Sequence, residues 1–262
     1  MLERDFGVAA PADGAGVYRE YLPPAALGAH FQCVWLHRAA QDHSGPVEVV
    51  PDGCVDMIWR EGRLHVAGPD ITTARPILKA GAVVLGARFR AGAASGWLGL
   101  PMSEIVGRAV DMADLWDARA VADINDRVGD AASPVAQARR LLRALAERAP
   151  SQPDPDPAAA RMFAWLHRGL GSAEPVATLR RRLDMSERTL LRRSRQHFGY
   201  GPKTLDRILR FQRFQAAARC ADCASLAEMA AEVGYADQAH LGREIQVLCG
   251  MSAATYVRQL GG

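Results

Sequence analysis

Near the C-terminal end of the chain, apolar residues recur twice at helical spacing, each time across a short polar break. In the first copy, residues 179–199, the break falls at residues 184–186, where Ser186 is suited to cap a second helix. In the second copy, residues 226–250, the break falls at residues 234–237. Two helices joined by so short a turn predict a helix-turn-helix, whose second helix can enter the major groove of DNA.

One long helix is predicted between the two copies, over residues 204–219. Its apolar side comprises Leu205, Ile208, Leu209 and Ala216, and its polar side carries Arg207, Arg210 and Arg213. A helix of about 16 residues spans roughly 24 Å. It can therefore hold two recognition helices about one turn of DNA apart, roughly 34 Å, so that one chain reads two successive major grooves.

Strand-like alternation dominates the first third of the chain. The pattern predicts strands over residues 30–38, 47–50, 54–59, 64–67 and 82–90, with turns at residues 51–53 and 61–62. On the first strand, one face carries Phe31, Cys33, Trp35 and His37, and the opposite face carries Gln32, Val34 and Leu36. The short loops favour a small antiparallel barrel or a curled sheet over parallel strands with crossover helices.

After Gly92 the pattern becomes helical, with helices predicted over residues 93–98, 101–106, 112–127 and 134–148. Residues 150–157 then hold four prolines and two aspartates, which predict an extended, semi-rigid spacer. A further helix is predicted over residues 158–171. We therefore expect an α+β protein with an N-terminal unit at 1–149, a linker at 150–157 and an all-α unit at 158–262.

Positive charge is concentrated in the C-terminal unit. The whole chain carries a formal net charge of +3, yet residues 158–262 contain 15 Arg and 1 Lys against 9 acidic residues. Most of the excess lies in residues 180–219, whereas residues 220–262 have two Arg and five acidic residues. Such a local basic stripe is typical of phosphate binding. The first copy is therefore expected to supply most of the electrostatic attraction to DNA, although a merely solvated basic face is the alternative.

Composition argues against several other classes of protein. With 49% hydrophobic residues, 262 residues suffice for two cores, and no run of 18 apolar residues or secretory signal pattern is seen, so a cytoplasmic protein without membrane association is expected. The five cysteines are few and odd in number, which fits reduced thiols. Cys220 and Cys223 form a CxxC pair, for which a redox switch remains a hypothesis.

No catalytic or metal-binding pattern emerges from the N-terminal unit. Its histidines are too scattered for the paired ligands of a metal centre in a small barrel. Cys54 and Asp56 alternate on one strand face, and a neighbouring carboxylate suppresses a thiol by raising its pKa. Nucleophile elbows, phosphate loops and zinc-finger spacings are also missing from the sequence. We therefore expect neither an enzyme nor a cofactor.

The C-terminal unit resembles the DNA-binding domain of AraC/XylS-type transcription regulators. The residues that carry the resemblance are the run 179–193, Phe198-Gly199, Pro202, the helix around Arg210, the run 234–243, Gly250, Ser252 and Tyr256. This resemblance implies a bacterial regulator that binds double-stranded promoter DNA, commonly as an activator that contacts RNA polymerase. It also implies the positions that face DNA: Ser186, Arg188, Thr189, Leu191 and Arg192 in the first recognition helix, and Gln238, Ala239, Gly242 and Arg243 in the second.

These positions suggest that the two copies are unequal. Arg188 and Arg192 suit guanine, because the guanidinium donors match O6 and N7 in the major groove, and Gln238 suits adenine. Ala239 and Gly242 present almost no side chain, so the second helix is expected to read fewer bases. His240 is expected to be mainly structural, with a direct base contact as the alternative.

The chain departs from the usual residues of the family at three positions. Ser194 and Ile245 stand where aromatic residues are common, and Ala253 stands where proline is common. A buried Ser194 hydroxyl would need a partner, such as the carbonyl four residues earlier. These departures bear on the stability of the domain, and they leave open a second function: a ligand-binding or interaction protein whose DNA binding is weakened.

The N-terminal unit is similar to an uncharacterised domain found on a subset of AraC-type regulators. The similarity rests on residues 50–59, Gly68-Pro69 and residues 86–92. In the wider family this half is often a cupin-like barrel followed by helices, which senses a small-molecule effector or forms a homodimer. Trp35, His37, Trp59 and Arg88 are the candidate effector-binding residues, with ordinary core packing of the aromatic side chains as the alternative.

Overall fold

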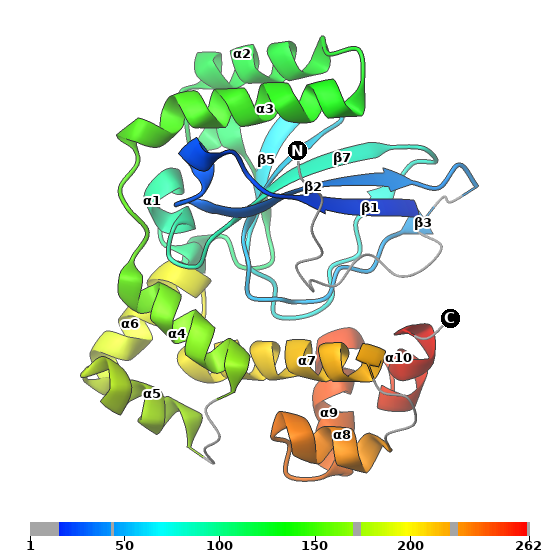
Figure 1. Ribbon diagram of the computed structural model, residues 1–262, viewed down its shortest axis with the longest axis vertical. Coiled ribbons are helices and arrows are strands. Elements are labelled where there is room, and N and C mark those ends of the chain that lie inside the picture. The colour runs from blue at the N-terminus through cyan, green and yellow to red at the C-terminus, as the bar shows by residue number, and fades with distance from the viewer. Residues whose placement is uncertain (1–15, 43–44, 170–173, 221–224, 261–262) are drawn as a thin grey trace.

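The computed structural model describes residues 16–42, 45–169, 174–220 and 225–260. Its N-terminal part is an antiparallel sheet with the strand order β1-β2-β7-β4-β5-β8 (Figure 1). The strands are β1 (Gly16–Tyr21), β2 (Phe31–Ala39), β4 (Asp56–Arg60), β5 (Arg63–Ala67), β7 (Val83–Phe89) and β8 (Ala109–Asp111). Two short strands, β3 (Gly45–Pro46) and β6 (Ile77–Leu78), pair with each other. In the described ranges the larger sheet is open between β1 and β8.

Helices cover one face of this sheet. They are α1 (Ala94–Leu98), α2 (Ala118–Gly129) and α3 (Pro134–Arg148), with single 3-10 turns at Ala25–Leu27, Met102–Glu104, Met112–Asp114 and Ala149–Ser151. Asp117 and Ser133 cap the starts of α2 and α3 with their side chains. Apolar residues of α1, α2 and α3 pack with those of the strands in one large core. The three helices therefore cover this face of the sheet, and they leave the opposite face uncovered.

A β-bulge decides which residues of β2 face the helices. The pairing of β2 with β7 shifts between Phe31 and Cys33, so that Phe31 lies opposite Phe89 and Cys33 lies opposite Arg88. Phe31 consequently packs in the helix-facing core, where its ring stacks on that of Phe89 with centroids 4.5 Å apart. The expectation that Phe31 shares a face with Cys33 is therefore wrong, because an extra residue in a strand reverses the alternation.

The C-terminal part is entirely helical in the described ranges. Its helices are α4 (Pro157–Arg168), α5 (Pro175–Leu183), α6 (Glu187–Phe198), α7 (Pro202–Cys220), α8 (Leu226–Val233), α9 (Gln238–Cys249) and α10 (Ala253–Leu260). The pairs α5–α6 and α8–α9 form the two helix-turn-helix units, at opposite ends of the long α7 (Figure 1). The α+β class and the helical C-terminal architecture are confirmed.

Several elements differ from the sequence-based expectation. Strands β1, β3, β6 and β8 were not expected, and the strand expected over 47–50 is only an isolated bridge between Val49 and Ala74. The helix expected over 112–127 is a 3-10 turn followed by α2, which begins only at Ala118. Asp111 caps the 3-10 turn and Asp117 caps α2, which explains why this stretch forms two elements and not one helix. The Cys220-Cys223 pair lies largely outside the described residues, so its geometry is not part of this structure.

The proline-rich segment 150–157 is not a free spacer. The backbone N–H of Asp156 donates to Gly92 O at 3.1 Å, and Pro153 packs against Gly96. Asp156 also caps α4 through the backbone N–H of Ala159, and its carboxylate pairs with Arg193 of α6. The segment therefore connects two parts that are packed against each other.

Candidate DNA-binding surface and ligand pocket

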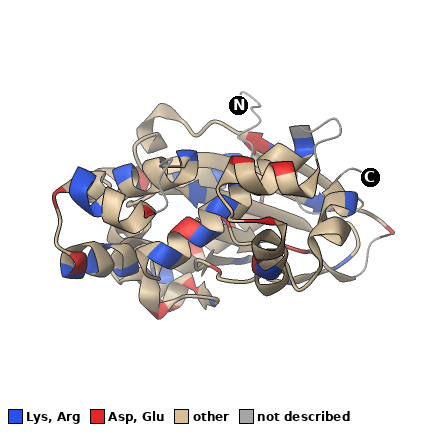
Figure 2. Cartoon of the chain, turned by 90° about the horizontal axis from the view of Figure 1, so that it is seen from below, with Lys and Arg blue, Asp and Glu red and all other residues tan. Residues whose placement is uncertain are grey.

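The first recognition helix, α6, presents its N-terminal half to solvent. Ser186 caps the helix by accepting a hydrogen bond from the backbone N–H of Thr189, and its Oγ donates to Thr189 Oγ1 at 3.0 Å. Arg188 and Arg192 are exposed, and Leu191 is half-buried. Figure 2 views this side of the molecule and shows basic residues toward the end formed by α5 and α6. The exposed arginines are therefore placed where base or phosphate contact is geometrically possible.

The arginines of α7 have a different role from the one expected. Arg207 pairs with Glu244 of α9 at 3.6 Å, and Arg210 pairs with Asp206 and stacks over the ring of Tyr235. Arg213 donates to the carbonyl oxygen of Leu166. These three side chains join α7 to its neighbours inside the domain. The expected basic stripe along α7 is wrong in this respect, because partners inside the domain occupy these three guanidinium groups.

The second recognition helix, α9, begins at an Asp237 cap whose carboxylate accepts from the backbone N–H of His240 at 2.6 Å. Gln238, Ala239 and Arg243 are exposed, and a Cβ at Gly242 would meet nothing within 4 Å. Among the four positions expected to face DNA, Gln238 and Arg243 therefore supply the only long polar side chains.

His240 and Ser194 both serve the packing of the C-terminal domain. His240 Nδ1 accepts from the backbone N–H of Ala236 at 3.3 Å, and its ring meets the Tyr235 ring edge-on. Ser194 is fully buried and donates to the carbonyl oxygen of Tyr200 at 2.7 Å. This carbonyl, and not the one four residues earlier, accepts the hydrogen bond, so the Ser194 hydroxyl is paired although no aromatic ring fills its position.

The N-terminal part holds α6 by its C-terminal half. Ser95 Oγ of α1 lies 2.9 Å from Nδ1 of His197, and the Asp156 carboxylate contacts both His197 and Arg193. Gly199, which ends α6 with φ +82°, has no room for a Cβ against Val106 and Pro69. One half of α6 is thus fixed to the N-terminal part while the other half stays exposed.

The C-terminal end of α9 is held in a similar way. The backbone N–H and the hydroxyl of Thr73 donate to Leu248 O at 2.8 and 3.0 Å. Arg75 Nη2 donates to Cys249 O at 3.2 Å and also pairs with Glu48. The last carbonyls of a helix have no partner within the helix, so the loop around Thr73 satisfies groups that α9 leaves open.

A cavity of about 320 Å³ opens on the sheet face opposite the helices. Trp35, His37 and Arg88 line it, together with Tyr18 and Ile58. The loops 47–54 and 68–76 and the short strand β6 cover it. Three of the four candidate effector-binding residues are therefore brought together.

Trp59 does not join the cavity. It lies one position from Ile58 along β4, so its side chain points to the opposite face and packs in the helix-facing core, with 6% of its surface exposed. The assignment of Trp59 to an effector site is therefore corrected by the alternation of the strand.

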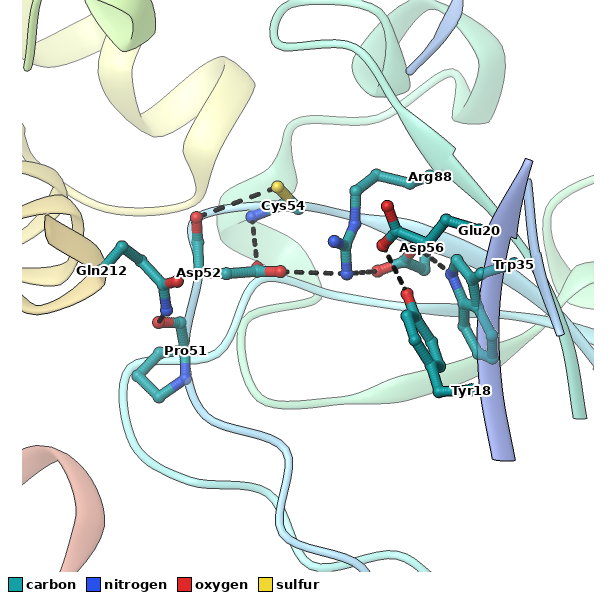
Figure 3. A network of polar contacts seen from close by, with 9 residues as sticks. All are labelled: Tyr18, Glu20, Trp35, Pro51, Asp52, Cys54, Asp56, Arg88 and Gln212. Carbon is teal, nitrogen blue, oxygen red and sulfur yellow. Dashed lines mark hydrogen bonds and ion pairs between the residues drawn. The ribbon is translucent and has the colours of Figure 1, made fainter. Parts of the chain in front are cut away.

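A buried polar network forms the floor of the cavity (Figure 3). Arg88 Nη2 lies between Asp52 Oδ2, at 3.0 Å, and Asp56 Oδ2, at 3.2 Å. Trp35 Nε1 donates to Asp56 Oδ1 at 2.8 Å. Burial alone would lower the pKa of Arg88, but Asp56 and Asp52 hold it above its usual range. The guanidinium therefore stays charged although only 6% of the residue is exposed.

The network continues to β1, where Tyr18 OH donates to Glu20 Oε1 at 2.7 Å. Burial raises the pKa of the Tyr18 hydroxyl, and the nearby Glu20 and Asp56 add to this while Arg88 opposes it. The Trp35 ring lies directly on β7, because a Cβ at Gly86 would stand 2.0 Å from a ring atom. Glycine at position 86 therefore gives Trp35 its place in the cavity wall.

Asp52, Asp56 and Asp70 were not selected from the sequence. A signal for the first two did exist, since Asp52 stands in the turn 51–53 and Asp56 alternates with Cys54 at the start of a strand. Asp70 had no such signal. Burial and the charges of Asp52 and Asp56 raise the pKa of Asp70 to about 6. Burial and Asp52 likewise raise the pKa of the Cys54 thiol, which keeps it protonated.

The loops over the cavity also touch the C-terminal domain. Pro51 O accepts a hydrogen bond from Gln212 Nε2 of α7 at 2.8 Å, and Gly53 lies against Leu205 and Phe163. A second, larger cavity of about 440 Å³ lies between the two parts, beside Phe163. The described ranges hold no group of three or more His, Cys, Asp or Glu side chains arranged for a metal ion. None of the described helices has the length and apolar character needed to cross a membrane.

Comparison with known proteins identifies both parts of the chain. Residues 179–259 match a helix-turn-helix domain family, and residues 19–111 match a domain of unknown function (DUF6597). No curated protein matches the sequence.

Among solved structures the chain is similar to ToxT from Vibrio cholerae. ToxT of strain O395 has 10% identity and a TM-score of 0.46, over 87% of this chain and 97% of that one. ToxT of strain O395 bound to (E)-4-(8-methylnaphthalen-1-yl)but-3-enoic acid has 10% identity and a TM-score of 0.45, over 88% and 99%. Another ToxT crystal form has 9% identity and a TM-score of 0.48, over 89% and 100%. This likeness is loose and says nothing of what the present chain binds.

The matched helix-turn-helix range spans both units, α5–α6 and α8–α9, with their exposed recognition helices. The C-terminal part of the chain therefore carries a helix-turn-helix domain, and a domain of unknown function precedes it over residues 19–111.

Proposed function

We propose that the chain is a transcription regulator of the AraC type, which binds specific promoter sequences through α6 and α9. A small effector in the cavity of its N-terminal part controls this binding. Residues 1–149 form the sensing and dimerisation unit, residues 150–157 the connection, and residues 158–262 the DNA-binding unit. The observation that carries the proposal is that the loops covering the cavity are also the loops that hold the DNA-binding domain.

The contacts with DNA come from the exposed halves of the recognition helices. Arg188 and Arg192 of α6 read bases, and Ser186 and Thr189 contact phosphate. On α9, Gln238 and Arg243 supply the polar contacts. Exposure of all four long side chains favours this function over that of a ligand-binding protein with weakened DNA binding.

Control by an effector follows from how the cavity is covered. The loop 47–54 contacts α7 through Pro51, and the loop around Thr73 contacts the C-terminal end of α9. A ligand that moves these loops changes the position of α9 relative to α6, and with it the fit to two successive major grooves. Such coupling requires that the ligand bind the two arrangements with different affinity.

The regulator is further proposed to act as an activator that contacts RNA polymerase, and to form a homodimer through its N-terminal unit. Both proposals come from the family resemblance. Transcription in vitro from a bound promoter, with and without the protein, tests the first, and light scattering of the full chain tests the second. A fall in transcript would make the protein a repressor.

DNA binding is tested by selecting bound sequences from random duplexes and measuring affinity by fluorescence anisotropy. Removal of one base contact costs about 1 to 3 kcal/mol, so Arg188→Ala and Arg192→Ala should each weaken binding about 5-fold to 150-fold. Arg119→Ala is the matched control, because Arg119 is an exposed arginine on α2, far along the chain from the helix-turn-helix units. Equal affinity of the α6 variants and the control would refute the assignment of α6.

Effector control is tested by filling the cavity without a ligand. Ile58 lines the cavity and is half-buried, so Ile58→Trp should occupy part of the space. We expect this variant to change the affinity for selected DNA, whereas Val135→Trp, at an exposed position of α3, should not. Unchanged affinity in a folded Ile58→Trp protein would separate the cavity from DNA binding.

A further inference from the structure

The cavity that the proposed function assigns to an effector has an unequal balance of charge on its inner surface. Asp52 and Asp56 flank the single guanidinium of Arg88, and Glu20 stands beside them under Tyr18. Among the described residues the other two lining arginines are farther out. Arg60 stands four residues beyond Asp56 along β4, about 13 Å away, and exposed Arg108 donates to Glu104 O. Negative charge therefore exceeds positive charge at the floor.

Asp70 adds a carboxyl group from the covering loop. Within the described residues its side chain makes no ion pair or hydrogen bond, although it is only partly exposed and lies in the field of Asp52 and Asp56. A carboxylate in such surroundings is unfavourable unless a positive group joins it. A positive group from outside the described part of the chain would relieve this cost.

Arg88 favours a ligand that also carries a hydrogen-bond acceptor. Its Nε and Nη1 atoms have no hydrogen-bond partner within the described residues, although 94% of the residue is buried and it lines the cavity. Two carboxylates already face the Nη2 side of this guanidinium. An additional carboxylate would be repelled by them, whereas a neutral acceptor, such as an ether or hydroxyl oxygen, is not.

The walls are suited to an organic cation. Tyr18 and Trp35 line the cavity with ring centroids 5.9 Å apart, and Ile58 and Val84 lie beside them. Aromatic faces attract cations, and the aliphatic side chains accommodate a hydrocarbon body.

We propose that the effector is a small protonated organic amine that also carries a neutral hydrogen-bond acceptor. The ammonium group lies among Asp52, Asp56 and Asp70, and the acceptor takes a hydrogen bond from Arg88. This inference rests on the proposed effector cavity and adds the chemical class of its occupant.

The charge of the ligand is tested with three probes of one shape: 4-methoxybenzylamine, 4-methoxybenzyl alcohol and 4-methoxybenzoate. Binding to the full chain is measured near neutral pH by titration calorimetry and by the shift in melting temperature. We expect the amine to bind at least tenfold more tightly than the alcohol and the benzoate to bind least. Equal or tighter binding of the alcohol or the benzoate, or no binding of the amine, would overturn the proposal.

The position of the ammonium group is tested with Asp70→Asn, which keeps the shape of the side chain and removes its charge. The affinity for the amine should fall about tenfold and the affinity for the alcohol should stay unchanged. Asp114→Asn, at an exposed position outside the cavity, is the control and should change neither. An unchanged affinity of Asp70→Asn for the amine would remove Asp70 from the site and contradict the placement.

The two levels of the proposal can fail separately. If Ile58→Trp alters DNA affinity but the benzoate binds best, the cavity is an effector site and the cationic class is wrong. If Ile58→Trp leaves DNA affinity unchanged and the amine still binds in a manner that depends on Asp70, the cavity binds a cation without controlling DNA.

Discussion

At the scale of single residues, the ionised Asp70 side chain lowers the free energy of unfolding by an amount that depends on pH. Burial and two nearby carboxylates raise its pKa to about 6 in the folded chain, against about 3.9 in an unfolded one. Between these values the folded state keeps a proton that the unfolded state has lost, so rising pH weakens folding. The free energy of unfolding is therefore lowered by the full amount above about pH 6 and is not lowered by Asp70 below about pH 4.

Asp70→Asn should therefore stabilise the ligand-free protein near neutral pH. Because the side chain is partly exposed, we expect a gain on the order of 1 kcal/mol. Chemical denaturation at several pH values measures it, and the gain should disappear toward pH 4. A gain of the same size at all pH values would mean that the substitution acts through something other than the charge.

Gly86 permits the close approach of the Trp35 ring to β7. Gly86→Ala would bring a Cβ to 2.0 Å from that ring, which must then move. Overpacking of this kind costs about 1 to 3 kcal/mol, and movement of Trp35 would also disturb the cavity. Thermal denaturation should show the loss, whereas Gly45→Ala, which meets nothing within 4 Å, should be nearly neutral.

The residues of the cavity could be predicted only in part from the sequence. Alternation correctly places Trp35 and His37 on one face of β2, because strand side chains alternate regardless of distant contacts. It fails for Phe31, where a bulge adds a residue, and for Asp70, which lies on a loop without periodicity. Trp59 was selected for its aromatic ring, although it is the neighbour of Ile58 in β4 and its side chain therefore points to the other face of the sheet.

At the scale of elements, the two recognition helices differ in what they offer to DNA. α6 exposes Arg188 and Arg192, whereas α9 exposes Gln238 and Arg243 beside a small alanine and an open glycine. Arg188→Ala with Arg192→Ala should abolish specific binding. Gln238→Ala with Arg243→Ala should retain binding and lose discrimination between the selected sequence and single-base variants. Anisotropy titrations with a set of such variants measure this, and equal losses from both pairs would refute the inequality.

Helices were easier to predict than strands. The Ser186 cap marks a helix start in the sequence itself, and the structure confirms it. Ser225 and Asp237 cap the starts of α8 and α9 in the same way. The short strands β6 and β8 have two and three residues and exist through pairing with distant segments. The arginines of α7 illustrate the same limit, since their partners Glu244 and Leu166 O belong to other helices.

At the scale of the whole molecule, the loop around Thr73 and Arg75 lies between the cavity and the C-terminal end of α9. Arg75→Ala removes the bond to Cys249 O and the ion pair with Glu48. We expect faster hydrogen exchange at the C-terminal end of α9 and a weaker influence of Ile58→Trp on DNA affinity. Exchange mass spectrometry and anisotropy measure the two effects. Arg119→Ala should show neither, and unaltered exchange in Arg75→Ala would show that this contact does not restrain α9.

The packing of residues 150–157 bears on how the chain can be cut into fragments. A fragment that starts at residue 158 loses the Asp156 cap of α4, worth about 1 kcal/mol. It also uncovers the apolar side chains of Phe163 and Leu205 where Gly53 now rests, which favours aggregation. Such a fragment would also lack the contacts of Ser95 with α6 and of Thr73 and Arg75 with α9, so its affinity for DNA would be that of recognition helices without these restraints.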